Sequence, residues 1–368
     1  MPSLGLVVGG PTRFNIEPMR RAVLSLSLLA ACGGADDAAL DGGPTDARPA
    51  TLDASLPDAS LVDASFAPMT LAETGLYSDP VNETLAPGVV EYTVNYPLWA
   101  DGAEKRRFVY LPYVMIDTSD MDFWHLPPGT KLWKEFTRDG VRVETRLLWK
   151  QGLTDDDWFA MSFAWNADGT EAIAAPNGVE DARGTPHDIP RATDCKTCHE
   201  RSPGFALGFA ALQLDHAEGE INLASLAATG RLSNPPAGRE APLLPLPGDP
   251  TAQAALGYLH GNCGPCHNES SDVQQKTPLI WRLDVDSLAT VEDTAAFRTA
   301  VGVAPQIQIP GYPSVIEPGD RSASAAYFRM GQRDPTNDSN VPMPPLSTEE
   351  PDGNGMAAVG EWIDSLAP

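Results

Sequence analysis

Cysteine and histidine are both scarce in this sequence. The 368 residues include five cysteines and six histidines. Four of the five cysteines stand in two pentapeptides, and the fifth stands near the N-terminus. A chain with so few cysteines is not a disulfide-rich scaffold, and its stability must come from packing and from any group that it holds.

Positive charge is also in short supply. The chain has 25 Lys and Arg against 50 Asp and Glu, a formal net charge of −25. Such a balance argues against nucleic-acid binding and against a polybasic membrane patch. It favours a protein partner with a basic docking surface, and encounter rates that depend on salt.

No apolar run approaches the roughly 20 residues that cross a bilayer as a helix. The nearest is a short run over 22–29, which follows Met19-Arg20-Arg21 and leads into Leu29-Ala30-Ala31-Cys32. Positive charge followed by a short apolar run is typical of a secretory signal. The last four residues resemble the lipobox of bacterial lipoproteins, in which Cys32 would be lipidated. An ordinary signal peptide with an incidental cysteine is the alternative.

What the sequence does contain is two CxxCH pentapeptides. They are Cys195-Lys-Thr-Cys198-His199 and Cys263-Gly-Pro-Cys266-His267. Cysteines three apart lie about one helical turn from each other, so both can bond the vinyl groups of one porphyrin. The adjacent histidine then offers its imidazole to the iron. The sequence therefore predicts two haem c groups as cofactors.

A zinc site with four cysteine ligands is the competing interpretation. Zinc ribbons pair their CxxC units over about 15–20 residues. Here 64 residues separate Cys198 from Cys263, and a ribbon needs no following histidine. Haem is the better interpretation. It also agrees with the expected export, because haem c is attached outside the cytoplasm.

The chain divides by composition into five segments. Residues 1–32 are a lipoprotein signal, with translation starting at Met1 or Met19, and 33–68 are an Asp-, Ala- and Pro-rich segment expected to be a disordered tether. Residues 69–185 hold six of the eight tryptophans and alternate apolar with polar positions, as in Val141, Val143, Thr145 and Leu147. That pattern predicts an antiparallel, sandwich-like β domain whose aromatic residues are mostly core.

The remaining residues are predicted to be helical. Residues 186–247 carry the first CxxCH, a helix near 205–214 and a Pro-rich connector. Residues 248–368 begin with Asp249-Pro250, an N-cap followed by proline at the first helical position, and end with an amphipathic helix. This layout matches that of class I cytochrome c. The fold class expected is α+β and multidomain, with c-type cytochrome segments after the β domain.

The sequence offers clearer candidates for the iron ligands of the second haem than for those of the first. His199 and His267 are the proximal ligands, and Val341-Pro342-Met343-Pro344-Pro345 resembles the segment that supplies the distal methionine in many cytochrome c domains. Met330, the competitor, reads as a core residue. The first haem has no such methionine nearby. His216 and His260 are the leading candidates for its sixth ligand, beside Met161, His187, His125 or an open position.

The ordered motifs resemble a family of bacterial di-haem c-type cytochromes with an N-terminal β domain. They include Tyr96–Arg107, Glu144-Thr145-Arg146, Trp165-Asn166, Arg191–Asp194, the segments 207–209 and 213–214, Tyr258–Asn262 and Met343–Leu346. The resemblance spans roughly residues 75–366. It implies two covalent haems and an exported redox protein, but no substrate.

The expected function is therefore electron transfer through two haems, in a protein lipid-anchored in the bacterial cell envelope. The outer membrane is the expected location, facing the periplasm or the cell surface. The rival is a haem enzyme, peroxidase- or oxidase-like, whose first haem is catalytic and whose second supplies electrons. A third interpretation makes the β domain a binding module and the haems sensory. The redox partner stays unknown.

Overall fold

The computed structural model describes residues 67–238, 240–333, 342–345 and 348–368. All of them belong to one compact unit, Ala59–Pro368. The predicted segments 69–185, 186–247 and 248–368 fall within this unit. The predicted signal with Cys32, and nearly all of the predicted tether, lie outside the described residues.

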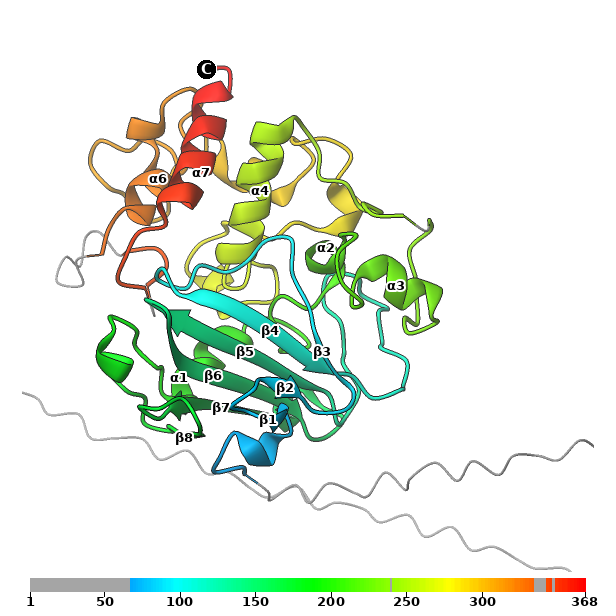
Figure 1. Cartoon of the computed structure of the whole chain (residues 1–368). Helices are drawn as coiled ribbons and strands as arrows, with labels where there is room; N and C mark the ends of the chain where they lie inside the picture. The colour runs from blue at the N-terminus through cyan, green and yellow to red at the C-terminus, as the bar shows by residue number, and fades with distance from the viewer. Residues whose placement is uncertain (1–66, 239, 334–341, 346–347) are drawn as a thin grey trace, which may run out of the picture. The chain divides into compact units, whose positions relative to one another are not determined.

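An antiparallel sheet of six strands forms the first half of this unit (Figure 1). Its strands follow one another in chain order: β3 (Val89–Glu91), β4 (Glu104–Tyr110), β5 (Lys131–Arg138), β6 (Val141–Lys150), β7 (Trp158–Trp165) and β8 (Ala172–Ala174). Hairpin turns such as Asp139-Gly140, where both residues have positive φ, join neighbouring strands. Short connections between sequential strands are what an antiparallel meander requires.

One face of the sheet carries most of the aromatic residues. Trp133, Phe163 and Trp165 are buried there against Leu76 and Tyr77 of the hairpin formed by β1 (Tyr77–Asp79) and β2 (Thr84–Leu85). The expected aromatic core is confirmed. In the part of the chain that the structure describes, however, the second layer of the expected sandwich is only this two-stranded sheet.

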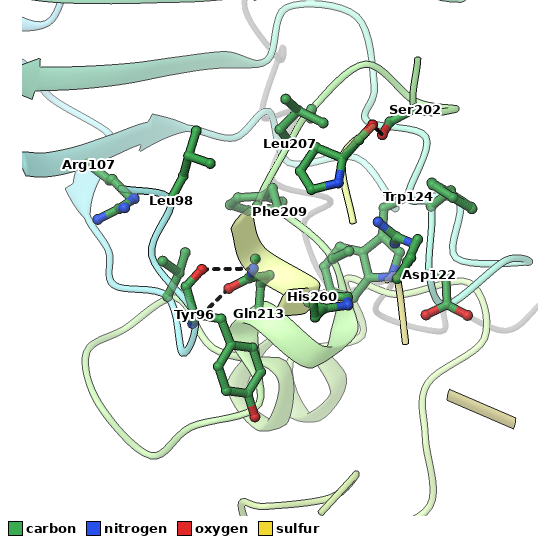
Figure 2. Close-up of a pocket in the computed structure, with 18 of the residues that line it drawn as sticks. Tyr96, Leu98, Arg107, Asp122, Trp124, Ser202, Leu207, Phe209, Gln213 and His260 are labelled. Atoms are coloured by element: carbon green, nitrogen blue, oxygen red, sulfur yellow. Dashed lines mark hydrogen bonds between the residues drawn. The ribbon is translucent and has the colours of Figure 1, made fainter. Parts of the chain in front are cut away.

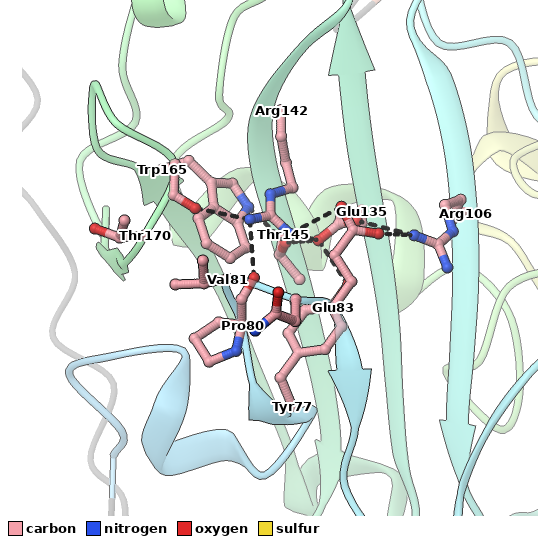
Figure 3. A network of polar contacts seen from close by, with 12 residues as sticks. Tyr77, Pro80, Val81, Glu83, Arg106, Glu135, Arg142, Thr145, Trp165 and Thr170 are labelled. Carbon is pink, nitrogen blue, oxygen red and sulfur yellow. Dashed lines mark hydrogen bonds and ion pairs between the residues drawn. The ribbon is translucent and has the colours of Figure 1, made fainter.

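A buried carboxylate, Glu135, lies on the same face (Figure 3). Tyr77 donates a hydrogen bond of 3.0 Å to it, and the guanidinium groups of Arg106 and Arg142 lie 3.8 and 3.7 Å from its oxygens. The Arg142 guanidinium also stacks 3.6 Å from the ring centre of Trp165. The two cations offset the cost of burying this charge, and the network ties the hairpin to the sheet.

The second half is helical, and its two longest helices pack against each other. These are α4 (Pro250–Asn262) and α7 (Gly353–Ser365). Asp249 accepts a 2.9 Å bond from the Ala252 amide, as the N-cap prediction requires. Leu256 of α4 and Trp362 of α7 are fully buried in the shared core. The predicted terminal helices are confirmed because caps and apolar spacing agree.

The other helices are short. They are α1 (Ala192–His199), α2 (Ala211–Leu214), α3 (Leu223–Ala228), α5 (Ala295–Ala300) and α6 (Ala325–Met330), with 3₁₀ turns η1 (Ala72–Thr74), η2 (Asp155–Asp157), η3 (Ala182–Gly184), η4 (Asp272–Gln275), η5 (Val285–Ser287) and η6 (Arg321–Ala323). The helix expected near 205–214 is limited to α2. The fold is mixed α+β, and among the described residues no helix is long and apolar enough to cross a membrane.

Candidate functional site

The first CxxCH motif lies on α1, which packs against β7. Asp194, at the third helical position, accepts a 3.2 Å bond from the Arg191 amide and thereby stabilises the start of this short helix. His199 ends the helix, and its Nδ1–H donates a 2.6 Å bond to the Phe205 carbonyl. That bond leaves the other ring nitrogen, Nε2, as the one available to a metal.

Burial keeps His199 neutral. Desolvation, reinforced by the positive charge of Lys134, lowers the pKa of His199 to about 3. A neutral imidazole with one nitrogen held by a backbone carbonyl is the form in which histidine ligates metals. His199 thus has the protonation state and the orientation that the predicted proximal ligand needs.

The second motif follows directly from α4. Cys263 caps the C-terminus of that helix, and the His267 amide donates a 2.9 Å bond to the Cys263 carbonyl. The His267 Nδ1–H donates a 3.2 Å bond to the Leu279 carbonyl. Both motif histidines are therefore held through Nδ1 by a backbone carbonyl a few residues downstream, although the two local folds differ.

The structure brings the two motifs together. The thiols of Cys198 and Cys266 interact, and this interaction lowers the pKa of Cys266 while raising that of Cys198. Beside it, the Ser202 hydroxyl donates a 3.4 Å bond to the Pro265 carbonyl. Arg201 lies 3.9 Å from the Cys266 sulfur. Two motifs that are far apart in the chain thus form one cluster.

A fully buried amide side chain holds this cluster. The Nδ2 of Asn268 donates to the carbonyls of Arg201, Gly264 and Pro265 at 3.0–3.2 Å. Arg201 in turn pairs with Asp272 at 2.7 Å. These contacts satisfy polar groups that burial would otherwise penalise. They also fix one motif against the other.

The segment 96–99 braces the second motif from the side of the sheet. The Trp99 amide donates a 2.7 Å bond to Oδ1 of Asn262, and Asn262 donates a 3.2 Å bond to the Pro97 carbonyl. A Cβ at Gly261 would stand 2.4 Å from the Tyr96 carbonyl oxygen. Only glycine permits this approach. The motifs Tyr96–Arg107 and Tyr258–Asn262, quoted separately from the sequence, are therefore in contact.

Met343, the predicted distal ligand of the second haem, lies between α6 and α7. Its amide donates a 3.1 Å bond to the Arg329 carbonyl, and its side chain is half-buried. Arg329 is also close enough to His267 to act on its charge. Met330 is buried in the core beside α4 and α7, as expected. Met343 and His267 thus share Arg329 as a neighbour.

The two histidines predicted as sixth ligands of the first haem differ in whether a ring nitrogen is left without a hydrogen-bond partner. The Nε2 of His216 contacts the Thr93 carbonyl at 3.1 Å, and its Nδ1 accepts a 3.3 Å bond from the Glu218 amide. His260 is buried and accepts a 3.1 Å bond at Nδ1 from the Leu283 amide. Its Nε2 has no partner among the described residues. This geometry favours His260 over His216.

The other candidates are engaged elsewhere. His125 lies 3.6 Å from Asp155, and His187 lies 2.8 Å from the buried Glu144. Within the described ranges, no three His, Cys, Asp or Glu side chains gather as a bare metal ion would need.

A pocket opens between the sheet, the loop after the first motif and α4 (Figure 2). Its cavity volume is about 50 Å³, and it is partly open to solvent. Figure 2 shows Arg107 and Leu98 on one side, with His260, Trp124 and Asp122 across from them. Burial raises the pKa of Asp122 to about 7, although Arg282 opposes the shift.

Sequence reasoning missed two features of this region. It identified neither the bridge made by Arg201, Asn268 and Asp272 nor the charged side chains on the face of the sheet near α1. For the latter a signal exists. On β6 the polar residues Glu144 and Arg146 alternate with the apolar ones, which places them together on the second face. No comparable pattern marks the bridge, because its members come from separate loops.

Comparisons with known proteins supply no relative from which to transfer a function. No family model, no curated protein and no solved structure matches the chain. The family resemblance therefore stays a prediction based on the motif residues. The mixed α+β architecture with antiparallel sheets rests on the structure itself.

Proposed function

We propose that the protein binds two haem groups covalently, at Cys195/Cys198 and at Cys263/Cys266, and passes single electrons between them and a partner. The observation that carries this proposal is the contact between the two motifs. Haems attached at Cys198 and Cys266 would have neighbouring thioether edges. Such a pair is suited to transfer between the two irons before an electron leaves the protein.

The described residues fit two such groups. All four motif cysteines are free of disulfide bonds and partly exposed. Several buried arginine nitrogens lack hydrogen-bond partners among the described residues, including Nη2 of Arg329 and Nε of Arg333. An unpaired buried guanidinium nitrogen is costly, and a propionate group is a suitable acceptor. The Arg329 guanidinium lies close enough to His267 to act on its charge, so this donor is near the second motif.

The chain's own residues would do three things for this function. His199 and His267 would present Nε2 to the metal, while the Phe205 and Leu279 carbonyls hold the rings in place. The Asn268 bridge would keep the two sites at a fixed separation. When bound, each haem supplies an iron that alternates between ferric and ferrous states.

The number of haems tests the proposal directly. The purified protein is expected to carry two covalent haems by mass and by the pyridine haemochrome assay. Replacing Cys195 and Cys198 with alanine should remove one of them, and replacing Cys263 and Cys266 should remove the other. A double Cys→Ala change that leaves both haems attached would contradict the assignment of that motif. A Lys196→Ala variant, changed inside the motif but not at a thiol, is the matched control.

A haem enzyme is the second candidate, and the pocket beside the first motif favours it. No methionine lies between Met161 and Met330. His260, whose Nε2 is free in the described part of the chain, lines this pocket. Carbon monoxide and cyanide bind a haem whose sixth position is open or weakly held. Two low-spin haems that ignore both ligands would exclude the enzyme, and binding at one haem would favour it.

We also propose that the protein is anchored in the cell envelope by lipid on Cys32, which lies outside the described residues. Cys32→Ser should release the protein from the membrane fraction into the soluble fraction, because the thioether-linked lipid can no longer be added. Fractionation with detection of haem measures this. Retention of the variant in membranes would refute the anchor. The acidic surface, with a net charge of −25, would then direct encounters with a basic partner.

A further inference from the structure

The second face of the sheet carries a row of positive charges that have few partners. Arg107 of β4 pairs across the strands with Lys134 of β5, which pairs with Arg146 of β6. Like charges directly opposite each other destabilise a sheet. The row lies inside a protein whose net charge is −25. A negatively charged group is therefore needed to compensate this row of positive charges in the interior.

Only one member of this row has a carboxylate partner among the described residues. Arg146 makes a two-bond contact with Glu144, at 2.6 and 2.9 Å. No carboxylate lies within 4.0 Å of Arg107 or Lys134 in the described part of the chain. Ser162, next in the row on β7, is fully buried and its hydroxyl has no hydrogen-bond partner there.

The row borders the pocket shown in Figure 2. Lys105, Arg107 and Lys134 line it from the sheet, and Arg282 lines it from the opposite wall, where its Nε is buried with no hydrogen-bond partner among the described residues. Carboxylates, Asp122 of the lining first, compensate the charge of Arg282. Arg107 and Lys134, on the sheet side, have no such compensation within 4.0 Å among the described residues, which leaves an excess of positive charge on that wall.

We propose that this pocket binds an anionic oxygen group, either a small oxoanion or a carboxylate, through Arg107 and Lys134. Planar guanidinium and ammonium donors are the groups proteins use for such ligands. Burial, with Arg107 and Arg146 next, lowers the pKa of Lys134 to about 7. A bound anion would reverse that shift and keep the lysine charged.

Two sources of this anionic group follow from the chemistry. One is a free anion that diffuses into the pocket. The other is a propionate of a haem at the first motif, and this alternative rests on the proposed function. Lys134 and Arg146 lie within electrostatic range of Cys195 and Cys198. Thioether bonds and propionates occupy opposite edges of a porphyrin, so this position favours the free anion.

The test uses the purified haem-containing protein and sulfate, which does not ligate haem iron. Calorimetric titration at constant ionic strength, with chloride as the balancing salt, should show saturable binding of about one sulfate per chain. Lys134→Met should weaken binding at least tenfold, because one of two charge-assisted contacts is lost. Lys134→Arg should restore it. Lys276→Met, on the exposed surface, changes the net charge equally and should leave binding unchanged.

A second measurement identifies the propionate source. If a propionate fills the site, sulfate does not bind. The haem midpoint potential then depends on pH where that propionate titrates, and Lys134→Met should move this dependence to higher pH. The sign follows because removing a cation raises the pKa of a carboxylic acid. The absence of both sulfate binding and this shift would overturn the inference. Haem content, measured on the same samples, reports separately on the proposed function.

Discussion

Replacing Glu144 with glutamine should lower the free energy of unfolding by about 3–5 kcal/mol, the range found when one partner of a buried ion pair is removed. Glu144 is fully buried on β6 and is bonded by Arg146 and by His187 at 2.8 Å. Glutamine keeps the shape but leaves the Arg146 guanidinium uncompensated. Urea unfolding followed by tryptophan fluorescence at pH 7 measures the effect.

The same carboxylate predicts a pH dependence. Burial alone would raise the pKa of Glu144, but Arg146 and His187 outweigh it and lower the pKa to about 2. A lowered pKa means that the stabilisation is complete above the ordinary value of 4.5 and is lost as the pH falls toward 2. The gap between wild type and Glu144→Gln should therefore close over that range.

Glu104→Gln is the matched control for this prediction. Glu104 begins β4 and is exposed, and its replacement should change stability by no more than about 0.5 kcal/mol. Equal urea midpoints for wild type and Glu144→Gln at pH 7 would show that the ion pair does not stabilise the fold. A gap that persists unchanged at pH 2 would show that another group causes it.

Replacing Met343 with alanine should abolish the weak long-wavelength absorption band of a ferric haem ligated by histidine and methionine. The proposed second haem would lose its sixth ligand, because alanine offers no sulfur. Its midpoint potential should change on the order of 100 mV, within the roughly 0.8 V over which axial ligands set haem potentials. The ferric spectrum and a redox titration of the purified protein measure both effects.

Met330→Leu controls for a general effect of losing a methionine. Met330 is buried in the α4–α7 core, and a volume-conserving change there should cost less than about 1.5 kcal/mol and leave the band intact. A band that survives in Met343→Ala refutes Met343 as the ligand. Loss of the band in Met330→Leu alone would instead assign the ligand to Met330.

Much of the fold could be predicted because its signals are local. Asp249 and Pro250 mark the start of α4, and apolar spacing around Val359 and Trp362 marks α7. Alternation on β6 predicted its strand. The second layer was harder to predict. The same alternation results when a sheet is covered by a hairpin on one face and by helices and loops on the other.

The sequence singles out the residues of the candidate site but not their arrangement. The CxxCH spacing identified Cys195 and Cys263 without reference to the rest of the chain. Their neighbourhood depends on Asn268, Arg201 and Ser202, whose partners are set by tertiary contacts. The basic row depends on strand register, which places Arg107 opposite Lys134. His216 looked as available as His260 until its partners, the Thr93 carbonyl and the Glu218 amide, were known.

The contact between Cys198 and Cys266 bears on the order of maturation. In an oxidising compartment, a chain that folded before receiving its cofactors would hold these two thiols against each other. A disulfide between them would consume one thiol of each motif and block both attachments. Under the proposed function, attachment of the haems to the reduced chain before it folds would avoid this disulfide. Folding would then be the last step of biogenesis and would bring the two loaded motifs together.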